Sequence, residues 1–100
     1  MVKHIVMWKL KEQAEGKTKK ENAEIIKSSL ESLKNKISEI VEIEVGINWN
    51  DSDAAYDVVL YSVFNTREDL DSYQVNPHHV EAAGYIKKVV ESRIVADYDK

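Results

Sequence analysis

The sequence predicts a ferredoxin-like α+β fold, and two observations lead to this prediction. First, strand-like alternation and helix-like periodicity follow one another in the order β-α-β-β-α-α-β along the 100 residues. With right-handed crossovers, this order builds a four-stranded antiparallel sheet whose first and third strands are central. Second, those two strands, residues 1–10 and 56–64, are apolar on both faces, as covered central strands are. We therefore expect a single domain over residues 1–100, with its helices on one face of the sheet.

The first half of the chain carries a clear helix start after the first strand. Residues 11–17 form a polar loop that contains a glycine, and Thr18 with Glu21 makes a capping box. The apolar positions that follow repeat every three or four residues and predict a helix that ends near Ser38. They are Ala23, Ile26, Leu30, Leu33 and Ile37.

Two further strands complete the expected sheet. Residues 41–49 alternate strictly, so one face is dry and the other wet, as in a strand near a sheet edge. The dry face holds Val41, Ile43, Val45, Ile47 and Trp49, and we expect this tryptophan in the core or an interface. Residues 92–99 close the chain as a strand, with Ile94, Ala96 and Tyr98 opposite Arg93, Val95 and Asp97.

The segment over residues 70–90 holds the candidate site. Thr66 is expected to cap a short helix that Asn76 ends, because a residue before proline avoids the α region. Asn76 then caps a second helix with Pro77 at its first position. On this helix His79 shares one side with Ala83, Ile86 and Val90, whereas Lys87 lies off that stripe. Tyr73, at the end of the previous helix, is expected to come near His79.

The face of the sheet without helices predicts a homodimer. We place on it Ile5, Met7, Val59, Tyr61, Val63 and Val95. No segment of the chain remains to cover these side chains, and the patch is larger than monomers commonly expose. The two subunits are therefore expected to pair sheet against sheet.

Composition excludes several classes of function. The net charge of −4 and the pI near 5.3 argue against nucleic acid as a partner. No cysteine provides a disulfide, thiol nucleophile or thiolate metal ligand. No apolar run is long enough to span a membrane, and a cytoplasmic location is expected. We expect no cofactor and no metal, because neighbouring histidines such as His78 and His79 point apart on a helix.

Three segments resemble one known family. VKHIVMWKLK at the start, SYQVNPHHVEAAGY in the middle and IVADYD at the end are similar to the stress-responsive α/β-barrel (Dabb) domain family. The resemblance spans nearly the whole chain, and its most specific parts are xKHxVxxK, Y-x-x-x-P-x-H and the closing D-Y. It implies a dimeric α+β barrel of two ferredoxin-like subunits. Family members include plant stress proteins and a plant polyketide cyclase similar to olivetolic acid cyclase.

The resemblance also implies roles for individual residues. In the cyclase a tyrosine and a histidine of the Y-x-x-x-P-x-H segment serve acid–base chemistry, and these positions match Tyr73 and His79. A histidine of the first strand matches His4, and the aspartate of the closing D-Y matches Asp97. A further cyclase histidine, on the third strand, has no match, because Val58 stands at that position.

Two hypotheses of different class follow. The first is a dimeric domain that binds an apolar or aromatic small molecule, or acts in a stress response, without turnover. The second is a cyclase- or lyase-like enzyme in which His79 is the base and Tyr73 the hydrogen-bond donor, since histidine exchanges protons near neutrality. Small residues such as Ala83 are compatible with room for a ligand beside His79, and equally with close helix–sheet packing.

Structural alternatives exist for each candidate polar residue. His79 can be a half-buried residue bonded to a carbonyl or to Tyr73, and His4 can be a satisfied core histidine. Asp97 can orient a histidine or face solvent from an edge strand.

Overall fold

The computed structural model describes residues 1–100, and its sheet has the predicted topology. Four strands lie in the order β4-β5-β1-β6, and all neighbours are antiparallel. Their bounds are β1 Val2–Leu10, β4 Ile40–Ile47, β5 Val58–Phe64 and β6 Val90–Asp99. The two central strands are β5 and β1, which are the strands whose apolar faces predicted that position. The ferredoxin-like fold is therefore confirmed.

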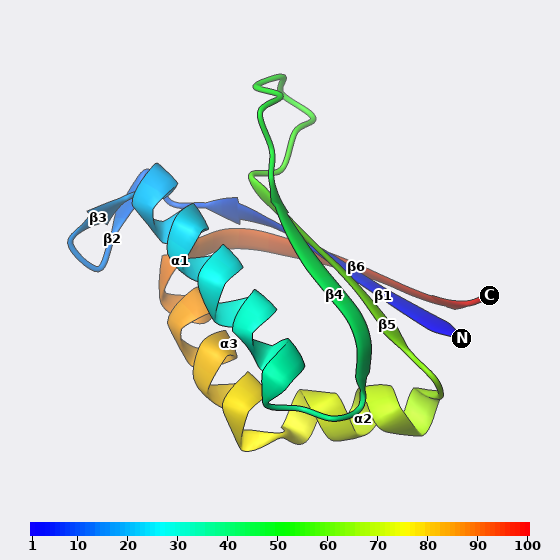
Figure 1. Ribbon diagram of the computed structural model, residues 1–100. Coiled ribbons are helices and arrows are strands. Elements are labelled where there is room, and N and C mark those ends of the chain that lie inside the picture. The colour runs from blue at the N-terminus through cyan, green and yellow to red at the C-terminus, as the bar shows by residue number, and fades with distance from the viewer.

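The helices cover one face of this sheet (Figure 1). They are α1 (Lys19–Glu31), which continues into a 3₁₀ turn η1 (Ser32–Asn35), α2 (Arg67–Val75) and α3 (Pro77–Val89). Figure 1 shows α1 and α3 side by side along the sheet and α2 across its lower end, with no element over the opposite face. No helix is long and apolar enough to cross a membrane.

The predicted helix starts are present. Thr18 and Glu21 form the reciprocal capping box at α1. At α2, Thr66 Oγ1 accepts a hydrogen bond from the backbone N–H of Asp69 at 3.0 Å. Asn76 separates α2 from α3 with an extended backbone (φ −61°, ψ 133°), and its side chain accepts from the N–H of His78. The proline-directed break therefore sets the angle between the two helices that carry Tyr73 and His79.

A small hairpin occupies the predicted polar loop. Strands β2 (Gln13–Ala14) and β3 (Lys17–Thr18) pair across Glu15 and Gly16, whose φ angles are +53° and +74°. Two positive φ values in succession are the geometry of a two-residue hairpin turn. The glycine marked a turn, but runs of two residues are too short to predict as strands from alternation.

The core lies between the sheet and the helices and contains 19 buried apolar residues. All five members of the predicted stripe on the first helix belong to it. Trp49 does not, because β4 ends at Ile47 and the indole is 93% exposed in the loop that follows. The prediction that places Trp49 on the dry face of a strand is therefore wrong. Val41 is also exposed, since the pairing of β4 with β5 shifts by one residue there.

In the last strand, β6, the residues lie on the opposite faces from those predicted. Val95 pairs with Val6, whose side chain is buried under the helices, so Val95 lies on the helix side and not on the outer face. Ile94, opposite Met7, lies on the outer face instead. Both sets of alternating positions in this strand include apolar residues, so polarity could not choose between the two registers.

Candidate functional site

A cavity of about 430 Å³ lies between α3 and the sheet. Its volume is in the range of small-molecule sites, roughly 300–1,000 Å³. Apolar side chains form most of its wall: Val6, Trp8, Leu30, Leu60, Val80, Ala83, Ile86 and Val90. The remaining lining residues are His4, Gln74, His79, Gly84, Lys87 and Arg93. The cavity borders β6, where the helices give little cover and residues 91–99 are exposed.

The pairing of β1 with β6 creates a histidine–carboxylate pair at this cavity. His4 lies opposite Asp97 in the register, on the helix side, and its Nδ1 is 2.5 Å from Asp97 Oδ1. The histidine is 2% exposed, whereas the aspartate side chain remains 44% exposed. Because an ionised carboxylate only accepts, His4 carries its proton on Nδ1. The other nitrogen, Nε2, has no protein hydrogen-bond partner and is the group that His4 offers to a ligand.

His79 is held in a similar way by the helix break. Its Nδ1 is 3.0 Å from the carbonyl oxygen of Gln74, in the last turn of α2, and a carbonyl also only accepts. Burial lowers the pKa of His79, the hydrogen bond with the Gln74 carbonyl opposes this shift in part, and the nearby positive charge of Arg93 adds to the lowering. The neutral ring is therefore favoured, with an unprotonated Nε2. The carbonyl bond proposed as a structural alternative is present, and it leaves this second nitrogen free.

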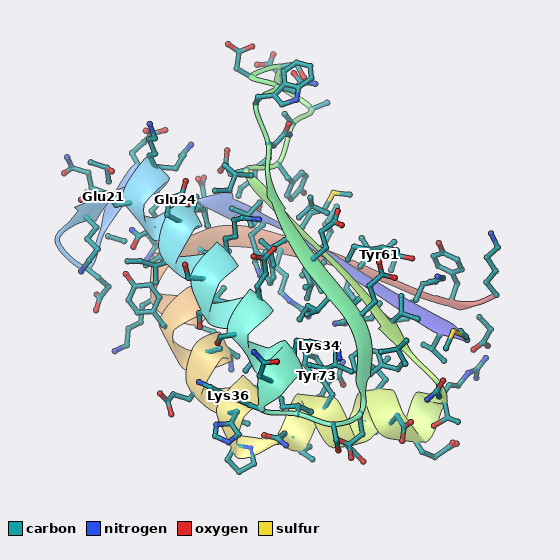
Figure 2. All side chains as sticks on the ribbon, viewed as in Figure 1. Glu21, Glu24, Lys34, Lys36, Tyr61 and Tyr73 are labelled. Carbon is teal, nitrogen blue, oxygen red and sulfur yellow. The ribbon has the colours of Figure 1, made fainter.

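Tyr73 packs between these histidines without lining the cavity. Its side chain is wholly buried, and its ring centroid lies 4.4 Å from that of His79, 6.3 Å from that of His4 and 4.9 Å from that of Phe64. Figure 2 shows Tyr73 on the helix side of the sheet, where no protein group hydrogen-bonds its hydroxyl. Burial raises the pKa of this hydroxyl. The role of Tyr73 as a donor to substrate stays a prediction.

The fold therefore gathers the five candidate residues in one region, although they come from both ends of the chain. His4, His79 and Ala83 line the cavity, Asp97 orients His4, and Tyr73 packs behind the rings. The buried face of α3 consists of Ala82, Ile86 and Val89. His79 and Ala83, through which the buried stripe was predicted, lie at the half-buried edge of this face. That edge faces the cavity.

Sequence reasoning missed both of the lysine and arginine side chains that line the cavity, Lys87 and Arg93, and also the polar Gln74. Lys87 lay off the apolar stripe. Arg93 is four residues before Asp97, so the alternation of a strand puts both on one face. This spacing was the one feature of the sequence that could have indicated Arg93. His78 is exposed and borders a smaller depression of about 200 Å³ between α1 and α3. No group of three or more histidine, aspartate or glutamate side chains is placed to hold a metal ion.

The comparison with known families gives the class of the protein. The model of the Stress responsive A/B Barrel Domain family (Dabb) matches residues 2–100. The chain belongs to this family. No curated protein matches the sequence.

Solved structures share the fold over the whole chain. A dimeric protein of unknown function with a ferredoxin-like fold from Bacteroides fragilis is 35% identical, with a TM-score of 0.84 over 99% of this chain and 95% of the other. A dimeric ferredoxin-like protein of unknown function from Thermobifida fusca is 18% identical, with a TM-score of 0.81 over 99% and 90% of the two chains. A hydroxynitrile lyase from Passiflora edulis is 24% identical, with a TM-score of 0.80 over 97% and 90%. The last two likenesses establish the fold alone.

Proposed function

We propose that this chain is a homodimeric Dabb domain that binds a small, mainly apolar molecule in the cavity beside α3. The observation that carries the proposal is the cavity itself, about 430 Å³, with apolar walls and two imidazoles whose Nε2 atoms have no protein partner. A few polar groups in an apolar concavity are the usual makeup of a small-molecule site. The proposal includes a cytoplasmic location and a role in a stress response, the latter supported by the family.

The dimer is proposed to form through the outer face of the sheet. Apolar and aromatic side chains gather there with part of their surface uncovered by this chain: Ile5, Met7, Val59, Tyr61, Ile94, Ala96 and Tyr98. Val63, which was also predicted on this face, is only 2% exposed in the single subunit. In Figure 2 Tyr61 lies on the side of the sheet opposite Tyr73. Two similar structures are described as dimeric, which supports a second copy as the occupant of this face.

Binding is tested with a neutral aromatic ketone, 4-phenylbutan-2-one, by two-dimensional NMR of the ¹⁵N-labelled protein. Addition of the ketone is expected to shift the backbone amide signals of His4, His79 and Ala83. Ala83→Phe places a large ring at the cavity wall and is expected to abolish these shifts. Ala54→Phe, in an exposed turn, is the matched control and leaves them unchanged. Shifts that persist in Ala83→Phe would place the ligand elsewhere and contradict the proposed site.

Acid–base catalysis is the second candidate, favoured by the two oriented imidazoles that share one cavity. His79 Nε2 is proposed to take a proton from the carbon beside a substrate carbonyl. The His4–Asp97 pair is proposed to stabilise the resulting enolate oxygen in a second protonation state, in which His4 takes a further proton from solvent on Nε2, the Nε2–H donates to the oxygen and Asp97 balances the imidazolium charge. Such chemistry belongs to cyclase- or lyase-type reactions, in which Tyr73 is the further expected donor.

This second candidate is tested without knowledge of the natural substrate. In D₂O the proposed base replaces hydrogen by deuterium beside the carbonyl of 4-phenylbutan-2-one, which ¹H NMR follows directly. His79→Asn is expected to retain binding and to lower the protein-dependent exchange rate at least a hundredfold, since positioned acid–base groups contribute about 10²–10⁴-fold. An exchange rate equal to that of buffer alone for the unmodified protein would leave binding without catalysis.

A further inference from the structure

Two positive charges at the cavity have no counter-ion. Lys87 and Arg93 line the cavity, and no aspartate or glutamate does. Neither side chain takes part in a salt bridge, whereas the exposed Arg67 pairs with Asp99. The protein as a whole carries a net charge of −4, and the nearby Asp97 is bonded to His4, so two unpaired cations in the cavity lining are a local exception.

The two charges lie on different walls. Arg93 belongs to β6 and lies opposite Trp8 in the strand pairing, which places it on the helix side of the sheet. Lys87 belongs to the last turn of α3, one turn beyond Ala83. A ligand in the cavity therefore has a cation on the sheet side and another on the helix side. Trp8 and Ile86, next to these cations, present apolar surface.

We propose that the ligand is an amphipathic monoanion, a molecule with an apolar body that fills the cavity and one carboxylate that Arg93 and Lys87 bind. This inference rests on the proposed binding function and names its ligand class. A carboxylate matches the planar fork of a guanidinium, and one such group satisfies both charges without a further polar partner. An apolar wall suits the rest of such a molecule, whereas a highly charged ligand would lose hydration there without compensation.

The cavity provides its own reporter. Trp8 lines the cavity and is 5% exposed, whereas Trp49 is 93% exposed and does not line the cavity. Trp49→Phe leaves Trp8 as the single tryptophan, so a change in fluorescence on titration reports occupancy of this cavity. All variants below carry this background substitution.

The probes are matched pairs that differ only in charge: octanoate with octan-1-ol, and 4-phenylbutyrate with 4-phenylbutan-1-ol. Each carboxylate is expected to bind roughly tenfold more tightly than its alcohol at low salt, because two exposed cations each add a modest attraction for the anion. Added salt is expected to reduce that difference, since exposed charges are screened. The double variant Lys87→Gln with Arg93→Gln is expected to remove the preference, so that each carboxylate binds no more tightly than its alcohol.

The control is Lys20→Gln with Lys88→Gln, which changes the net charge equally at exposed positions outside the cavity lining. This control is expected to keep the preference for carboxylates. Equal binding of acids and alcohols, or a preference that survives loss of Lys87 and Arg93, would overturn the ligand class and leave the proposed binding function standing. Absence of any Trp8 response to all four probes would overturn both.

Discussion

Replacement of Tyr73 by phenylalanine is expected to stabilise the ligand-free protein. The ring of Tyr73 packs against those of Phe64, His4 and His79, and its hydroxyl is buried without a hydrogen bond from any protein group. A buried polar group without a partner costs about 1–3 kcal/mol of folding free energy. Phenylalanine keeps the ring contacts and removes the oxygen, at the expense of a small gap. We expect a net gain of about 1 kcal/mol in the free energy of unfolding, or about 5 °C in the thermal midpoint.

The assay is urea unfolding at fixed protein concentration, because the stability of a dimer depends on concentration. Tyr85→Phe is the matched control. The hydroxyl of Tyr85 donates to Oδ1 of the buried Asn22 at 2.5 Å, so the same chemical change is expected to cost about 1 kcal/mol there. The two substitutions should therefore shift stability in opposite directions.

The result that refutes this reasoning is a loss of stability in Tyr73→Phe comparable with that of Tyr85→Phe. The hydroxyl would then have a hydrogen-bond partner in the folded state, and the orphaned oxygen could no longer be connected with function. A gain in stability together with weaker ligand binding would instead support a functional hydroxyl, since strained or unsatisfied groups are retained where function needs them.

Three further predictions concern the charge pair, the dimer and pH. Asp97→Asn is expected to lower the free energy of unfolding by about 1 kcal/mol, the scale of one hydrogen bond to a charged, half-exposed group. Long-range ¹H–¹⁵N NMR should show that the Nδ1–H tautomer of His4 is no longer dominant, and an unchanged tautomer population would contradict the orienting role. Tyr61→Glu is expected to give a monomer by analytical ultracentrifugation, whereas Val75→Glu, at a 76% exposed helical position, keeps the dimer; a stable Tyr61→Glu dimer would exclude the outer sheet face. The pKa of His79 is lowered from 6.5 by burial, so just below this pH the unfolded chain binds more protons than the folded one, and the free energy of unfolding falls with falling pH. His79→Asn should reduce this dependence of stability on pH, and an identical dependence in urea unfolding would refute the shift.

The fold could be predicted from the sequence because the local patterns of periodicity, capping and helix breaking all indicated the same arrangement of elements. The element order, the capping box at Thr18 and the Asn76–Pro77 break are local signals, and each is found in the structure. The central position of β1 and β5 followed from the absence of a polar face. The failures occurred where local signals were weak: Trp49 continued an alternating pattern past the end of its strand, and Val95 had apolar neighbours on both faces.

The candidate site likewise has one part that could be predicted from the sequence and one part that could not. The nearness of Tyr73 and His79 could be predicted, because both flank one helix break and are six residues apart in the chain. The bond between His4 and Asp97 joins residues 93 positions apart, and only the register of β1 with β6 brings them face to face. A shift of one residue would have turned Asp97 to the opposite face of the sheet.

The amino-acid sequence by itself determined the element order, the helix starts at their N-caps and the apolar character of both sheet faces, since these depend on residues close in the chain. The end of the first helix was predicted near Ser38, whereas α1 ends at Glu31 and the 3₁₀ turn that follows it ends at Asn35. The edge position of β6 followed from the element order, but tertiary structure alone decided that the helices would give this strand little cover and that a cavity would form there between α3 and the sheet. It also placed Lys87 and Arg93 on two walls of one space. Empty volume and uncompensated charge are properties of packing between distant segments, and no local pattern of residues specifies them.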